Sequence, residues 1–108
     1  MRPQTAEIQQ LHAQVCQALG DPTRIIILYF LSEKPHTVSD LVKATGQSQP
    51  LISRHLKMLR ERGMVTTERD GSSVIYSLAD KRVIQALDLM REVLADQLAR
   101  QAQLANYV

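Results

Sequence analysis

The chain has 108 residues, of which 44% are hydrophobic and 22% charged, and its formal net charge is only +2. These values are typical of one folded domain over residues 1–108, and no apolar run reaches the roughly 20 residues that a membrane-spanning helix requires. The first residues lack the apolar stretch of a secretion signal, and the single cysteine, Cys16, excludes an intramolecular disulfide. We therefore expect a cytoplasmic protein without a membrane segment.

Two helices are predicted at the start of the chain. Apolar residues recur at helical spacing over about residues 6–19, and Gly20 ends this first helix. Asp21-Pro22 begins the second, with Asp21 as the N-cap and the proline in the first helical position. The second helix is apolar nearly all round as far as Leu31, which predicts a position at the centre of the core.

Two shorter helices follow, separated by a tight turn that contains Gly46. Thr37 or Ser39 caps the first of them, and Ser48 caps the second. The residues expected to face the core are Leu41, Val42 and Ala44, followed by Ile52, Leu56 and Leu59. Residues 37–63 are therefore predicted to form a helix-turn-helix.

Beyond Gly63, which is the expected C-terminal cap, the hydrophobic period changes from about 3.6 residues to 2. Two β-prone segments, 65–69 and 73–78, flank Asp70-Gly71, and this dipeptide is a strong signal for a tight hairpin turn. A hairpin that directly follows a helix-turn-helix is typical of the wing of a winged-helix protein. The wing is expected over about residues 65–78.

From Asp80 the helical period returns and predicts a last helix over about residues 80–105. Its apolar stripe is wide enough to pack against a partner helix. The predicted fold is mainly α with a small β-hairpin, in the order ααααββα of a winged helix-turn-helix.

The second helix of the helix-turn-helix carries the residues that point to DNA. Once its inward positions are assigned to the core, Gln49, Ser53 and Arg54 remain near its N-terminal end, where they can reach base edges. Arg54 suits a bidentate contact with guanine, whereas Lys57 and Arg60 suit phosphates. The alternative is that all these side chains form a solvated polar face. The expected DNA-contacting set is Ser48, Gln49, Pro50, Leu51, Ser53, Arg54, Lys57, Arg60 and, at the wing, Arg69, Gly71 and Ser72.

Three segments of the chain resemble motifs of the ArsR/SmtB family. Residues 18–24 resemble its ALGDPTR signature, residues 48–65 its recognition helix, and residues 70–78 its wing. The resemblance covers roughly residues 11–98. It implies a transcriptional repressor that dimerises through its first and last helices, binds a twofold-symmetric DNA operator and is released by an effector.

The two metal sites common in this family are not expected here. Where the family carries a Cys-x-Cys pair for soft metals, this chain has Thr37 and Ser39, which are poor ligands for such ions. In the zinc site of the last helices only Asp80 is kept. The other ligand positions hold Arg82, Val93 and Asp96, which together do not provide a tetrahedral zinc site.

Two histidines and the cysteine leave alternatives open. His12 lies four residues before Cys16, on the same side of the first helix. The pair, duplicated in a dimer, could hold a soft metal ion or form an intersubunit disulfide, or Cys16 is a buried core residue and His12 is merely exposed. His55 either contacts DNA or senses pH from an exposed face, or it is a packed structural side chain.

Three other functions compete with an effector-released repressor. The chain could be a constitutive or redox-responsive regulator that needs no metal, or a winged-helix module for protein contacts. An enzyme is not expected, because no phosphate loop, nucleophile elbow or His-Glu metal motif is present. Ser53 and His55 do not face each other on a helix and make no catalytic pair.

Overall fold

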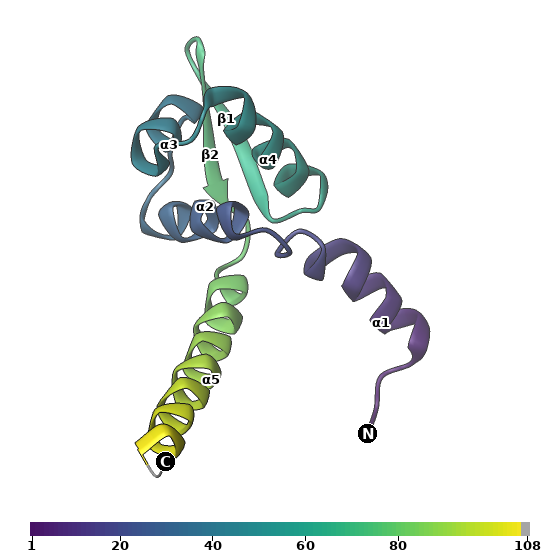
Figure 1. Cartoon of the computed structure of the whole chain (residues 1–108). Helices are drawn as coiled ribbons and strands as arrows, with labels where there is room; N and C mark the ends of the chain where they lie inside the picture. The colour runs from purple at the N-terminus through teal and green to yellow at the C-terminus, as the bar shows by residue number, and fades with distance from the viewer. Residues whose placement is uncertain (107–108) are drawn as a thin grey trace.

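The computed structural model describes residues 1–106 and has the predicted order of four helices, a hairpin and a helix (Figure 1). The first helix departs from regular α geometry, because it changes into one π-helical segment before it ends. The elements are α1 (Thr5–Leu11), η1 (His12–Cys16), α2 (Pro22–Glu33), α3 (Val38–Thr45), α4 (Gln49–Glu61), β1 (Val65–Asp70), β2 (Ser73–Leu78) and α5 (Lys81–Asn106). None of the described helices is both long enough and apolar enough to cross a membrane.

The molecule consists of a body and two projecting helical arms (Figure 1). The body contains α2, α3, α4 and the hairpin; we call residues 5–17 the α1 arm and residues 89–106 the α5 arm. The radius of gyration is 17.0 Å, whereas a compact chain of this length has a value of about 13 Å. The larger radius of gyration arises from the two arms, which extend away from the body and do not pack against each other.

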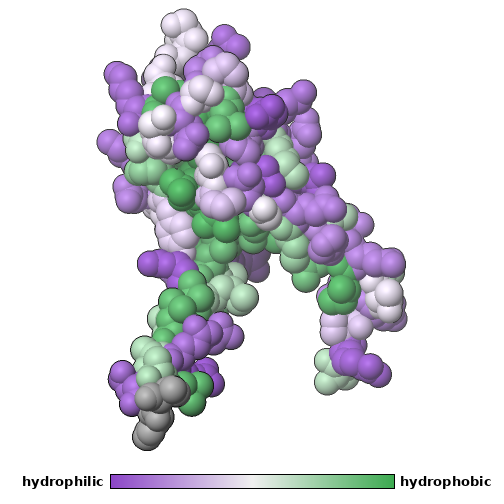
Figure 2. Space-filling view, viewed as in Figure 1, coloured by the Kyte–Doolittle hydropathy of each residue, from purple (hydrophilic) through white to green (hydrophobic). Residues whose placement is uncertain are grey.

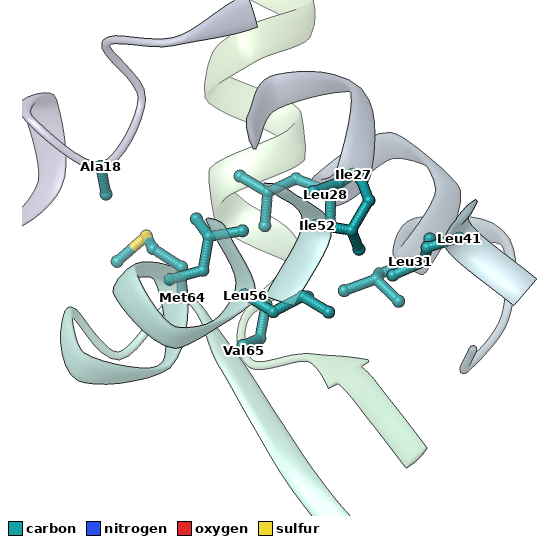
Figure 3. Packing of buried hydrophobic residues seen from close by; sticks show 10 residues of the cluster. Ala18, Ile27, Leu28, Leu31, Leu41, Ile52, Leu56, Met64 and Val65 are labelled. Atoms are coloured by element: carbon teal, nitrogen blue, oxygen red, sulfur yellow. The ribbon is translucent and has the colours of Figure 1, made fainter. Parts of the chain in front are cut away.

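The core of the body forms where α2, α3 and α4 meet the start of β1 (Figure 3). Because its largest side chains are completely buried, this core anchors the inner face of α4. The buried hydrophobic residues are Ala18, Ile27, Leu28, Leu31, Leu41, Ile52, Leu56, Leu59, Met64 and Val65. The inward positions predicted for α4 are thus confirmed.

Two of the predicted core positions are wrong. Ala44 is exposed, since α3 turns only Leu41 fully inward and leaves Val42 half-buried. In α2, Ile26 is 48% exposed, so this helix is not central on every side. Its uncovered side lies toward α5, where the Tyr29 hydroxyl donates a hydrogen bond to Asp88 at 2.6 Å.

The helices of the body begin at the predicted caps. The Asp21 carboxylate accepts from the Thr23 backbone N–H at 2.8 Å. Thr37, rather than Ser39, caps α3 and forms a reciprocal capping box with Asp40. Gly46 follows in the left-handed region with φ 71°, which lets the chain turn sharply into α4.

The hairpin turn lies one residue later than predicted. Asp70 still pairs with Ser73, so the two-residue loop is Gly71-Ser72, and only Gly71 has a positive φ, 63°. Glycine at the first loop position is the usual choice for a tight hairpin of this kind. Two backbone hydrogen bonds between His36 and Tyr76 tie the hairpin to the segment before α3.

Candidate nucleic-acid interface

Helix α4 presents a polar face that the core does not use. Since its apolar residues are locked into the body, the residues between them point outward. The exposed residues of this face are Gln49, Pro50, Arg54, Lys57 and Arg60, and Leu51 and Ser53 are half-buried. These are the residue types and positions that the sequence predicted for DNA contact.

The N-terminal end of α4 is ordered by short-range hydrogen bonds. The Ser48 hydroxyl accepts from the Leu51 N–H at 3.4 Å, and the Gln49 amide donates to the Ser53 hydroxyl at 3.3 Å. Within residues 1–106 the Arg54 guanidinium makes no hydrogen bond or ion pair. The start of α4 therefore offers helix N–H groups, an amide and a free guanidinium at one exposed end.

The wing tip lies at the same end of the body. Figure 1 shows the hairpin loop and the start of α4 on the side opposite the two arms. Ser48, Arg69, Gly71 and Ser72 are all exposed there. The arrangement permits a helix in a major groove with a loop against the flanking backbone.

His55 is not part of this exposed face. It is only 8% exposed, and its Nδ1 lies 3.2 Å from the Arg24 guanidinium and its Nε2 3.9 Å from the Asp21 carboxylate. Burial, together with the nearby Arg24 and Arg54 charges, lowers the pKa of His55 below its usual value, although Asp21 opposes the shift. The packed, structural interpretation of His55 therefore holds.

Arg62, at the C-cap of α4, turns away from the polar face of this helix. Its guanidinium donates to the Ala13 carbonyl and, at 3.2 Å, to the Gln17 side-chain oxygen. Sequence patterns gave no sign of this contact, because the partners are 45 or more residues apart.

Cys16 and His12 are both exposed in the single chain, so of the two interpretations of Cys16, burial in the core of its own chain is wrong. Among the described residues no group of three or more His, Cys, Asp and Glu side chains is placed to hold a metal ion. Asp80 instead forms an ion pair with Arg82 at 2.7 Å, and the hydrogen bonds from Arg82 lower the pKa of Asp80 to about 2.

The two arms expose a large amount of apolar surface. Helices α1 and α5 contain no buried residue at all. Figure 2 shows hydrophobic surface that continues from the body onto both arms. The exposed large side chains are Ile8 and Leu11 on the α1 arm and Leu89, Met90, Val93, Leu94, Leu98 and Leu104 on the α5 arm. Apolar patches of this extent mark contact surfaces.

Comparison with known proteins gives consistent results. Residues 21–67 match the model of the family described as "Bacterial regulatory protein, arsR family". The chain is 42% identical over 90 residues to the HTH-type transcriptional regulator NmtR of Mycobacterium tuberculosis, covering 81% of this chain and 75% of NmtR. It is 38% identical over 99 residues to a probable mercury resistance operon repressor of Streptomyces lividans, covering 88% of this chain and 79% of that protein.

A solved structure also matches in shape. It is the homodimeric winged helix-turn-helix DNA-binding domain of Mb0332 from Mycobacterium bovis, described as a possible ArsR-family transcriptional regulator. The TM-score is 0.76 at 28% sequence identity, and the match covers 93% of this chain and 95% of that one. The predicted family resemblance and winged-helix fold are thereby confirmed.

Proposed function

Because the chain belongs to the arsR family of bacterial regulatory proteins, we propose that this DNA-binding transcriptional regulator is a repressor. It binds a twofold-symmetric operator as a homodimer, and an effector releases it. Residues 1–108 act as one domain in this proposal, although residues 107 and 108 lie outside the described part of the structure. The compartment is the cytoplasm, where the operator DNA lies.

The observation that carries DNA binding is the exposed polar face of α4. In this proposal α4 lies in the major groove, with Arg54 on guanine and Gln49 on adenine. Lys57 and Arg60 contact phosphates, and so does the N-terminal end of the helix at Ser48. Pro50, Leu51 and Ser53 complete the contact surface of the helix.

The wing supplies the remaining contacts. Arg69, Gly71 and Ser72 lie exposed around the hairpin loop and reach the backbone or minor groove beside the α4 site. The glycine at the tip allows close approach of the main chain to DNA, because it has no side chain.

A second copy of the chain is the proposed partner of the arms. An isolated α5 arm that exposes six large apolar residues is costly in water, because each such side chain gains about 1.5–3 kcal/mol on full burial. The homodimeric state of the Mb0332 domain supports this choice of partner. Two copies joined through residues 6–19 and 80–105 would place their α4 helices about one DNA turn apart, roughly 34 Å.

The effector is the least constrained part of the proposal. Cys16 lies on the α1 arm, four residues from His12 and within the segment proposed to join two copies. Two such thiols, one from each copy, can be oxidised to an intersubunit disulfide or hold a soft metal ion. A thiol-responsive regulator that requires no metal is the competing function that this position favours.

Selection of DNA from a random duplex library by the purified protein tests the proposed binding. We expect enrichment of two inverted half-sites with centres about 10 base pairs apart, and affinity that falls steeply with salt. Failure to enrich any sequence, with equal binding of Arg54→Ala and wild type to all duplexes, would contradict the proposal.

Release of the selected duplex tests the effector. The complex is treated with oxidant or with zinc, cadmium, copper or arsenite, and Cys16→Ser is the matched variant. Release of wild type but not of Cys16→Ser makes Cys16 the sensor. Identical behaviour of both proteins under every treatment excludes Cys16 from sensing.

A further inference from the structure

The end of the α1 arm is held by two arginines that come from the body. From α2, the Arg24 Nε donates to the Ala18 carbonyl at 2.8 Å and its Nη2 to the Gln17 carbonyl at 3.1 Å. From the C-terminal end of α4, Arg62 donates to the Ala13 carbonyl and to the Gln17 side chain. A carbonyl oxygen has two lone pairs, so the Gln17 carbonyl accepts from Arg24 in addition to the Gly20 backbone N–H at 3.1 Å.

The same Arg24 also contacts the recognition helix. Its Nη1 lies 3.2 Å from Nδ1 of His55, in the middle of α4. Arginine has only donors, so Nδ1 must be the unprotonated nitrogen of a neutral imidazole, whose Nε2–H then faces Asp21. The lowered pKa of His55 agrees with this neutral state.

The α1 arm is therefore attached to α4 at two separate points, one in the middle of the helix and one at its end. The planar guanidinium fixes the direction of several bonds at once, whereas a lysine ammonium does not. The connection between the α1 arm and α2 is also short. Only Leu19 and Gly20 lie between Ala18, whose carbonyl binds Arg24, and Asp21, the N-cap of α2. Because these contacts join the end of the arm to two places on α4, a change in them would alter the angle between the arm and α4.

We propose that Arg24, His55 and Arg62 are positioning residues which determine the half-site spacing that the dimer selects. The inference rests on the proposed function, in which the arms form the dimer and α4 reads DNA. A rotation of about 5° between arm and α4, acting over roughly 17 Å, half the 34 Å between recognition helices, moves each helix by about 1.5 Å and changes their separation by about 3 Å. That change is close to one base-pair step of about 3.4 Å.

The test uses the full chain and a set of duplexes that carry the selected half-sites at different spacings. Centre-to-centre distances run from about 9 to about 12 base pairs, around the value for one helical turn. A duplex with a single half-site completes the set. Binding is measured by fluorescence anisotropy, and thermal unfolding of each variant is recorded in parallel.

Arg62→Met is the first variant, because Arg62 lies outside the core and its loss should leave the body folded. We expect wild type to prefer one spacing by about tenfold over its neighbours, and Arg62→Met to reduce that preference to about threefold or less. Affinity for the single half-site should change by less than about threefold. Lys43→Met, which removes an exposed cation of the body that lies outside both arms and outside the proposed DNA-contacting set, should keep the wild-type preference.

Two variants of His55 distinguish the effect of its hydrogen bond with Arg24 from the effect of packing its ring in the body. Asn places its side-chain oxygen near the position of Nδ1 and can accept from Arg24, so His55→Asn should retain the spacing preference. His55→Phe keeps a ring of similar size without an acceptor and should lose the preference while it remains folded. Arg24→Lys keeps the positive charge but not the planar guanidinium, so this variant should also lose the spacing preference.

Three results would overturn the inference. Equal loss of affinity at every spacing in Arg62→Met and His55→Phe, with the preference ratio unchanged, would show that these contacts only stabilise the fold. Retention of the preference by both variants would show that the contacts do not set the angle. Absence of specific binding by wild type itself would contradict the proposed function, and this inference with it.

Discussion

The body and the arms are built from similar amphipathic helices but bury them very differently. Helix α4 has 13 residues and buries four of them, whereas α5 has 26 residues and buries none. Helix α5 also carries a hydrophobic stripe, in which large apolar residues such as Met90, Leu94 and Leu98 recur at helical spacing. A stripe of this kind shows that a helix needs a partner, but it does not show whether that partner lies in the same chain.

Helix capping distinguishes the body from the α1 arm but not from α5, because the Asp80 carboxylate before α5 accepts from the Arg82 backbone N–H at 2.9 Å. Each helix of the body begins with a side chain that accepts a backbone hydrogen bond, at Asp21, Thr37 and Ser48. The cap position of α1, Gln4, makes no such bond. The body thus combines local caps with its own core, whereas α1 has no side-chain cap and neither α1 nor α5 contains a buried residue.

The largest expected effect lies in the body. Leu56→Ala removes a completely buried side chain from α4 and should lower the free energy of unfolding by about 2–5 kcal/mol, through lost burial and the cavity that remains. Urea denaturation measures this value. Lys43→Ala, at an exposed position of the body, serves as the control and should stay within about 0.5 kcal/mol of wild type. Similar values for both variants would contradict the role of Leu56 in the core of the body.

In the arms the expected effect is on association. Leu94→Glu places a charge within the exposed apolar stripe of α5 and should convert the dimer to monomers, with a loss of operator affinity of roughly 100-fold or more. Gln103→Glu adds the same charge on the opposite side of the helix and should remain dimeric. Sedimentation equilibrium distinguishes the two. Equal dimerisation of both variants would show that this stripe is not the interface.

On the polar face of α4, Arg54→Ala should weaken specific binding by about 1–3 kcal/mol and relax the base preference at one position. Lys57→Ala should instead weaken binding to all sequences alike and reduce the salt slope by about 1. Anisotropy titrations at several salt concentrations, on the selected duplex and on variants of it, measure both. Stability of the body should not change in either case.

The smallest effect is the pH dependence at His55. Its pKa is lower in the folded chain than in the unfolded one, so the unfolded state binds more protons and stability falls as the pH drops below about 6.5. Thermal melts between about pH 5 and 7.5 should show this decrease in wild type. His55→Asn, which cannot be protonated, should show a flatter profile; an identical slope would assign the decrease to other groups.

Much of the body was predictable because its signals are local. The caps at Asp21 and Thr37 and the buried positions of α4 follow from short-range chemistry and from the helical period. The hairpin was also predicted, one residue out of place, because the sequence does not show whether Asp70 ends the strand or enters the turn.

The features that could not be predicted depend on contacts between residues that are distant in the sequence. No pattern near Arg62 or Arg24 indicates that they bind the end of the α1 arm, and neither the burial of His55 nor the exposure of Cys16 was fixed by helical spacing. The exposed side of Ile26 was missed for a related reason, because an apolar residue looks the same whether its partner is in the same chain or in a second copy.

The most direct test of the central claim is the stoichiometry of the protein on its selected duplex, measured by sedimentation equilibrium of the complex. The account predicts two chains for each pair of half-sites, bound cooperatively, and a loss of this cooperativity in Leu94→Glu but not in Gln103→Glu. One chain bound with full affinity and specificity, or two chains bound independently, would contradict the proposal that the arms join two copies to read DNA.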